Sequence, residues 1–94
     1  MSTGSMNEAQ VADVVVNVLA RETGVSPGKI DIDRSVASVP GIDSVLLLRA
    51  VLGIEETLGI SIPDEDLFEA QSVRDLIDIV ARVANEQNQN HSTT

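Results

Sequence analysis

Apolar residues recur at three- and four-residue intervals in three stretches of the chain, the spacing of amphipathic helices. The first stretch covers residues 7–23. Its apolar stripe consists of Val11, Val14, Val15, Val18 and Leu19. Ser5 with Glu8 fits a capping box at the start of this stretch, and Gly24 fits its C-terminal stop. We predict a helix here that is held by packing, because its valines have only modest helix propensity.

The second stretch covers residues 43–58, with Asp43 as the N-cap and Gly59 as the C-cap. Its predicted inward face is formed by Val45, Leu48, Val51, Leu52 and Glu55. The run of three leucines at residues 46–48 is more apolar than one buried stripe requires. The first turns of this helix are therefore expected to expose hydrophobic surface.

The third stretch begins at Ser72, which forms a second capping box with Asp75. Its apolar stripe consists of Val73, Leu76, Ile77, Val80 and Val83. From Asn85 onward the chain is polar and aperiodic, so we predict a disordered tail over residues 85–94.

The segments between these helices are rich in turn signals. Residues 24–42 form a connection that is long for a compact domain, and connections of this length are often functional. The apolar residues that pin it to a core are Ile30, Ile32, Val36 and Val39. Residues 60–63 alternate like a strand but are too short to count as one. Residues 64–69 indicate a short acidic helix that turns Leu67 and Phe68 inward.

The predicted fold is all-α: a small bundle of three longer helices plus one short helix, with a long loop after the first helix. Residues 7–84 are assigned to a single domain. Residues 1–6, a small Ser/Gly-rich leader, are interpreted as vector-derived and kept outside the fold. The core must be aliphatic, since Phe68 is the one aromatic residue. A deep pocket of about 300 Å³ or more is expected to be hard to form in such a core.

The 94 residues include 15 acidic and 6 basic side chains, which gives a formal net charge of −9. This balance argues against nucleic-acid binding, which needs a surplus of Lys and Arg, and favours partners with basic surfaces. The absence of cysteine excludes disulfides, thiolate metal sites and cysteine nucleophiles. No apolar run approaches the roughly 18 residues of a membrane span, and the start lacks the features of a signal peptide. We therefore expect a cytoplasmic protein that does not bind membranes.

The sequence contains few residues that could form a catalytic or a metal site. The single histidine, His91, falls in the predicted tail, where it cannot be held against a serine and a carboxylate. The segment from Asp31 begins like a calcium loop, but Val36 replaces the glycine and Ile42 the glutamate that such a loop needs. No catalytic residue and no metal ligand are expected, and a hydrolase is the least favoured class.

Ser44 is the remaining candidate for chemistry. It follows the N-cap Asp43 in the first helical turn, where free backbone N–H groups and the helix dipole favour an attached anion. A hydroxyl at this position can carry a phosphodiester. On these two residues alone, a helix cap followed by an unmodified serine is the favoured interpretation.

The neighbourhood of Ser44 changes that interpretation. The chain resembles the acyl carrier protein family in residues 41–45 (Gly-Ile-Asp-Ser-Val), 55–56 (Glu-Glu) and 60–65 (Ile-Ser-Ile-Pro-Asp-Glu). In that family Asp-Ser opens the second helix, and a Glu-Glu pair near its end precedes an Ile-Pro-Asp-Glu-type turn. The resemblance covers roughly residues 7–84, and the interval from Ser44 to Pro63 fits without a gap.

The resemblance implies that Ser44 is esterified with 4′-phosphopantetheine, which a separate phosphopantetheinyl transferase moves from coenzyme A. By the same resemblance, Asp43 helps the transferase recognise the site. The arm supplies the thiol that this chain lacks, so that acyl groups travel as thioesters between acyl-loading and acyl-transferring enzymes. Such a protein is a carrier rather than an enzyme, and the monomer is its expected state.

The surroundings of Ser44 are also predicted to contact these partner enzymes. The residues assigned to this surface are Val45, Leu46, Leu47, Arg49, Glu55, Glu56, Asp64 and Glu65. Fatty-acid carriers usually show acidic residues along the exposed face of the second helix, whereas Leu46, Leu47 and Arg49 occupy it here. The Leu-Phe-Glu run at residues 67–69 is similar to polyketide and peptidyl carriers. Both features favour a polyketide-type or other specialised pathway.

Two alternatives stay open. A peptidyl or aminoacyl carrier shares the attachment chemistry but receives an amino acid from an adenylating enzyme. An unmodified acidic interaction module would instead use Leu46, Leu47 and the carboxylates to bind a basic partner, and would not need Ser44.

Overall fold

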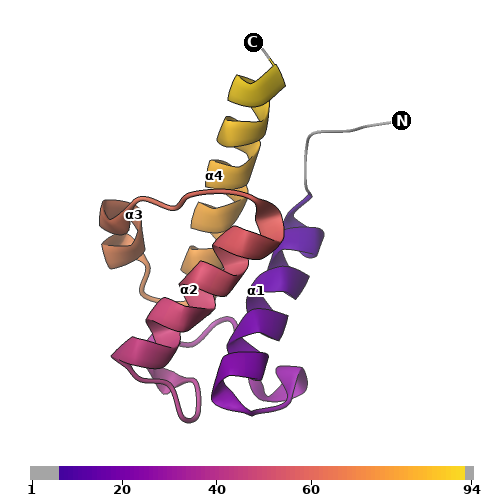
Figure 1. Ribbon diagram of the computed structural model, residues 1–94. Coiled ribbons are helices and arrows are strands. Elements are labelled where there is room, and N and C mark those ends of the chain that lie inside the picture. Colours follow the sequence, from indigo (N-terminus) through magenta and orange to yellow (C-terminus); the bar gives the residue numbers. More distant parts are fainter. Residues whose placement is uncertain (1–6, 93–94) are drawn as a thin grey trace.

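The computed structural model describes residues 7–92, with side chains placed up to residue 87. Its α-helices are α1 (Glu8–Thr23), α2 (Ser44–Leu58), α3 (Asp64–Glu69) and α4 (Val73–Ser92). Two single turns of 3-10 helix, η1 (Pro27–Lys29) and η2 (Val36–Ser38), lie in the loop between α1 and α2. The described residues contain no strand, only one isolated bridge between Ser35 and Ser72. The predicted all-α bundle of three long helices and one short one is confirmed (Figure 1).

The helix ends follow from local chemistry. α1 is capped by Asn7, whose side chain accepts a hydrogen bond of 2.8 Å from the backbone N–H of Gln10. The side chain of Gln10 accepts one in return from the N–H of Asn7, so this capping box lies two residues beyond the one predicted at Ser5. Ser5 itself lies outside the described residues. Gly24 and Gly59 adopt positive φ and end α1 and α2 as predicted.

The core is wholly aliphatic, and no polar side chain is buried in the described part of the chain. α1 packs against both α2 and α4, and α3 packs against α4 (Figure 1). The largest fully buried side chains are those of Val11, Val15, Leu19, Ile54, Val73, Leu76 and Val80. The apolar stripes predicted for the first and last helices therefore face this core, with Val14 only half-buried.

The long loop of residues 24–42 is fixed to the body of the protein. Ile30, Val36 and Val39 are buried, as predicted, and Ile32 is half-buried. The backbone N–H of Val36 donates to the carbonyl of Gln71 over 2.8 Å. The loop is thus tied to the start of α4, where it supports the entry into α2.

Two predictions about side-chain burial are wrong. Of the two α3 residues predicted to turn inward, Leu67 packs against the core, but Phe68 is 86% exposed, because the six-residue α3 turns only one of these neighbouring side chains towards the core. On α2, the residues predicted to face inward that prove exposed are Val45, Leu48 and Leu52. The buried positions of that helix are Ala50, Val51 and Ile54, with Leu47 half-buried beside them.

The predicted disordered tail also differs from the structure, since α4 continues to Ser92. Gln87 anchors this extension: its side-chain amide donates to the carbonyl of Ser61 over 2.7 Å and accepts from the N–H of Ser61 over 3.1 Å. The segment also lacks glycine and proline, so nothing in its composition interrupts a helix. Residues 1–6 and 93–94 of the predicted leader and tail lie outside the described residues.

The cap of α4 makes a pH-dependent contribution to stability. The backbone N–H groups of Ser72 and Gln71 donate to the Asp75 carboxylate over 3.2 and 3.1 Å, and these bonds lower its pKa. An acid whose pKa is lowered by folding stabilises the fold above its unfolded pKa of about 3.9. That stabilisation is lost as the pH falls through the folded value.

Asp75→Asn is therefore expected to lower the free energy of unfolding near pH 7, with the difference from wild type shrinking towards about pH 3. Urea unfolding of both proteins across this pH range measures the effect. An equal difference at every pH would show that the loss comes from altered packing rather than from the charge.

Candidate functional site

Ser44 is the first residue of α2, and its side chain is exposed. Asp43 before it caps the helix, because its Oδ1 accepts a hydrogen bond of 2.8 Å from the backbone N–H of Leu46. Gly41 has a φ of 80°, a conformation that favours glycine, and it turns the chain into the cap. The local sequence thus presents the Ser44 hydroxyl at the start of a helix.

The start of α2 suits a bound anion. The N–H groups of Leu46 and Leu47 are bonded to Asp43, whereas those of Ser44 and Val45 have no hydrogen-bond acceptor among the described residues. After the cap Asp43, the first turn contains no further acidic residue. Free N–H groups and the positive end of a 15-residue helix dipole together favour a phosphate at this point.

No side chain described in the structure forms a hydrogen bond with the Ser44 hydroxyl. His91 lies in the last turns of α4, beyond the residues whose side chains are described. The hydroxyl is exposed, and in the described residues no side-chain base is bonded to it.

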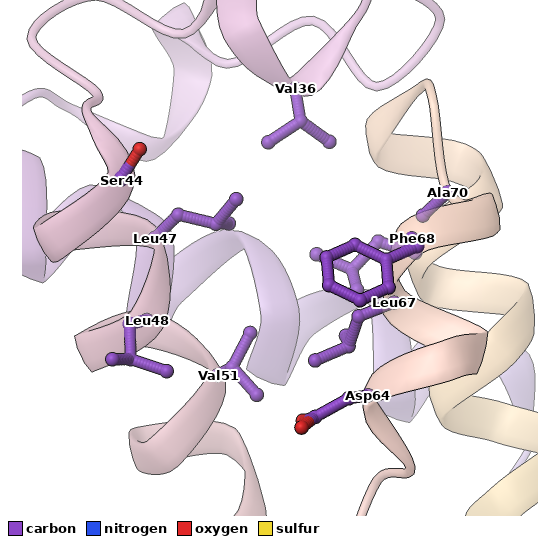
Figure 2. A pocket seen from close by; sticks show the side chains of 10 residues that line it. Val36, Ser44, Leu47, Leu48, Val51, Asp64, Leu67, Phe68 and Ala70 are labelled. Atoms are coloured by element: carbon purple, nitrogen blue, oxygen red, sulfur yellow. The ribbon is translucent and has the colours of Figure 1, made fainter.

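Beside Ser44 a groove of about 420 Å³ runs between α2 and α3. Its lining is almost entirely apolar and consists of Val36, Ser44, Leu47, Leu48, Val51, Asp64, Leu67, Phe68, Ala70 and Leu76. Figure 2 shows Ser44 at the α2 edge of the groove and Phe68 on the opposite, α3 side. A second hollow of about 510 Å³ reaches Ser44 and Asp43 from the loop side.

A deep pocket of about 300 Å³ or more was expected to be hard to form in this core, and the structure has a wide open groove instead. α3 is short and packs on α4 rather than closely on α2, which leaves the space between α2 and α3 open. The sequence reveals the apolar lining residues but not the distance between the two helices.

The predicted partner residues fall into distinct environments. Val45 and Arg49 are exposed on α2, whereas Leu46 and Leu47 are half-buried. Leu47 lines both the groove and the second hollow, so it joins the core to the site.

Glu55 is not a free surface carboxylate. It is half-buried, and its Oε2 accepts a hydrogen bond of 2.7 Å from the backbone N–H of Ile62. This bond holds the turn that leads to α3. Glu56, Asp64 and Glu65 are exposed, with Asp64 at the groove lining.

Three exposed hydrophobic residues near the site were not identified from the sequence: Leu48, Leu52 and Phe68. A signal for the first two exists in the helical pattern. The residues at 47, 50, 51, 54 and 58 repeat at the intervals of one helix face, which places positions 48 and 52 on another face. Phe68 has no comparable signal.

Comparison with known proteins identifies the family. Residues 13–80 match the family described as "Phosphopantetheine attachment site". The chain is 29% identical over 76 residues to the acyl carrier protein of Tropheryma whipplei (strain Twist), which covers 81% of this chain and 93% of that protein.

It is also 30% identical over 77 residues to the acyl carrier protein of Syntrophobacter fumaroxidans, which covers 82% of this chain and 95% of that protein. The acyl carrier protein of Thermosynechococcus vestitus is 28% identical over 75 residues, across 80% and 93% of the two chains. The family match covers α2, α3, most of α1 and the first eight residues of α4.

The members of this family are carriers rather than catalysts, and they work with a phosphopantetheinyl transferase and with biosynthetic enzymes. In the described residues, no helix combines the length and hydropathy of a membrane span. The helical bundle, the exposed serine at the start of α2 and the family match lead to one conclusion: the chain belongs to the acyl carrier protein family, whose prosthetic group is 4′-phosphopantetheine.

Proposed function

We propose that Ser44 is the residue that carries the 4′-phosphopantetheine arm. The observation behind this proposal is the exposed Ser44 hydroxyl beside two backbone N–H groups without an acceptor, at the start of a 15-residue helix. These groups fit a phosphodiester at the serine oxygen. When bound, the arm supplies a thiol on which acyl groups are carried as thioesters.

The attachment reaction is the transfer of the phosphopantetheine group from coenzyme A to Ser44. The bond between phosphorus and the Ser44 oxygen forms as the pyrophosphate bond of coenzyme A breaks, and the adenosine bisphosphate half leaves. The serine proton goes to a base of the transferase. The chain itself contributes the position of the hydroxyl, the N–H groups of Ser44 and Val45, and the cap formed by Asp43.

The absence of cysteine provides a direct test. The unmodified protein should contain no thiol before treatment. After incubation with coenzyme A and a broad-specificity phosphopantetheinyl transferase, and removal of free coenzyme A, one thiol per chain is expected. If a folded and unmodified protein gains no thiol, the unmodified acidic interaction module becomes the better account.

The pathway we propose is polyketide-type or another specialised biosynthesis. It is supported by Leu46, Leu47 and Arg49 on α2, where fatty-acid carriers usually show acids, and by the exposed Phe68 on α3. The test is which enzyme consumes the new thiol. Loading by an acyltransferase from an acyl-coenzyme A supports the proposal, whereas loading only by an adenylating enzyme with an amino acid indicates a peptidyl carrier.

We also assign Asp43 to recognition by the transferase, and two variants separate this role from helix capping. Asp43→Asn keeps a good N-cap and removes the charge, so it should leave the stability nearly unchanged but slow the modification about tenfold or more. Asp43→Ala should in addition lose about 1 kcal/mol of stability. Rates of thiol appearance and urea unfolding measure both effects. A wild-type rate for Asp43→Asn would leave Asp43 with the capping role alone.

A further inference from the structure

The outward side of α2 carries an unusual combination of residues for so acidic a protein. We define the outer face of α2 as Val45, Leu48, Arg49, Leu52 and Glu56, which are all exposed and repeat at helical intervals. Val45, Leu48 and Leu52 are 64%, 59% and 50% exposed. Three large apolar side chains clustered next to the modified serine indicate a contact surface for another protein.

Arg49 lies within this apolar cluster without a partner. The other arginines of the described structure all lie within 4.0 Å of a carboxylate, and their partners are Glu22, Asp31, Asp33 and Asp66. Arg49 makes no ion pair or hydrogen bond in the described residues. The neighbours one turn away on its helix are Val45, Leu46, Leu52 and Gly53, none of which is charged.

An unpaired guanidinium among apolar side chains limits which partner surface can bind to this face of α2. Burying the apolar residues under a partner also removes water from Arg49, and a desolvated charge is costly unless it is paired. The guanidinium presents donors in a planar fork that matches a carboxylate. Glu56 lies about two turns away, too far along the helix to supply that carboxylate.

The net charge of −9 is compatible with a partner that places a carboxylate against Arg49. Charges beyond about 8 Å are largely screened at physiological salt, so the groups that meet in the contact determine the pairing. On the outer face of α2 these groups are the cation Arg49 near Ser44 and the anion Glu56 towards the far end.

We infer that the enzyme that acylates the arm docks on the outer face of α2 and places an aspartate or glutamate carboxylate against Arg49. This inference rests on the proposed attachment at Ser44. It specifies a partner surface that is apolar around one acidic group, instead of the uniformly basic surface that the overall charge favours.

The test uses the full chain after modification and, as the probe, a purified acyltransferase that loads its thiol from an acyl-coenzyme A. Arg49→Glu is expected to lower kcat/KM for the carrier about tenfold or more, chiefly through KM. Lys29→Glu is the matched control, because it makes the same change in net charge at an exposed cation in η1. It should change kcat/KM by less than about threefold.

A charge-reversing substitution in the acyltransferase then completes a double-mutant cycle with Arg49→Glu. Changing the acidic residue opposite Arg49 to lysine should restore activity towards Arg49→Glu and reduce it towards wild type. Equal losses for Arg49→Glu and Lys29→Glu would overturn the inference, and so would faster loading of Arg49→Glu. Because thiol formation is measured first, failure of the attachment at Ser44 is distinguished from failure of this docking contact.

Discussion

Replacing Ser44 with alanine is expected to abolish attachment of the arm completely. The variant should contain no thiol after treatment with coenzyme A and the transferase, and it should hold no acyl group, because the oxygen that we propose as the acceptor of the phosphorus is gone. The fold should be retained, since the Ser44 side chain is exposed and the cap is made by Asp43. Thiol titration and intact mass measure the loss.

Ser26→Ala is the matched control for this prediction. Ser26 is also exposed and also precedes a helical turn, but its side chain makes no cap hydrogen bond and it lies outside α2. This variant should gain one thiol per chain, as the wild type does. A thiol on Ser44→Ala would mean that another residue accepts the arm.

The second large effect concerns stability. Ile54→Ala removes a side chain that is fully buried between α2 and the rest of the core. The expected loss is about 2–5 kcal/mol, from lost burial and from the cavity left behind. For a protein whose total stability is of order 5–15 kcal/mol, this loss is a large fraction of the whole. Urea unfolding followed by helical circular dichroism measures it.

Leu52→Ala tests whether burial is the cause. Leu52 belongs to the same helix but is half exposed and lines its outer face, so its loss should cost about 1 kcal/mol or less. Similar losses for Ile54→Ala and Leu52→Ala would contradict the orientation of α2 described above.

The sequence predicted the helices well because their signals are local. The helix caps act through groups within one turn, as at Asp43, Gly24 and Gly59. The buried residues of α1 and α4 lie on one side of each helix. The capping box of Ser72 and Asp75 is local in the same sense. Such features can be recognised without knowing what packs against them.

The orientation of α2 could not be predicted in the same way. This helix carries large apolar residues on two faces, and the small Ala50 marks the buried one while Leu48 and Leu52 lie on the other. A preference for large apolar residues therefore selected the wrong stripe. The two faces have different roles, one packing the core and one exposed beside Ser44.

The remaining differences between the sequence-based predictions and the structure depend on contacts between segments that are distant in the sequence. The exposure of Phe68 and the groove follow from how α3 lies on α4. The continuation of α4 past Asn85 follows from the bonds between Gln87 and Ser61, which are 26 residues apart. No local pattern contains that information.

The most direct test of the account is to locate the arm within the chain. After modification, cleavage at arginine releases the peptide of residues 35–49, which contains Ser35, Ser38 and Ser44. Backbone fragmentation of this peptide in the mass spectrometer distinguishes the three serines. The account predicts one 4′-phosphopantetheine, carried by Ser44 alone. The arm on any other residue, or a folded protein that stays unmodified at Ser44, would contradict it.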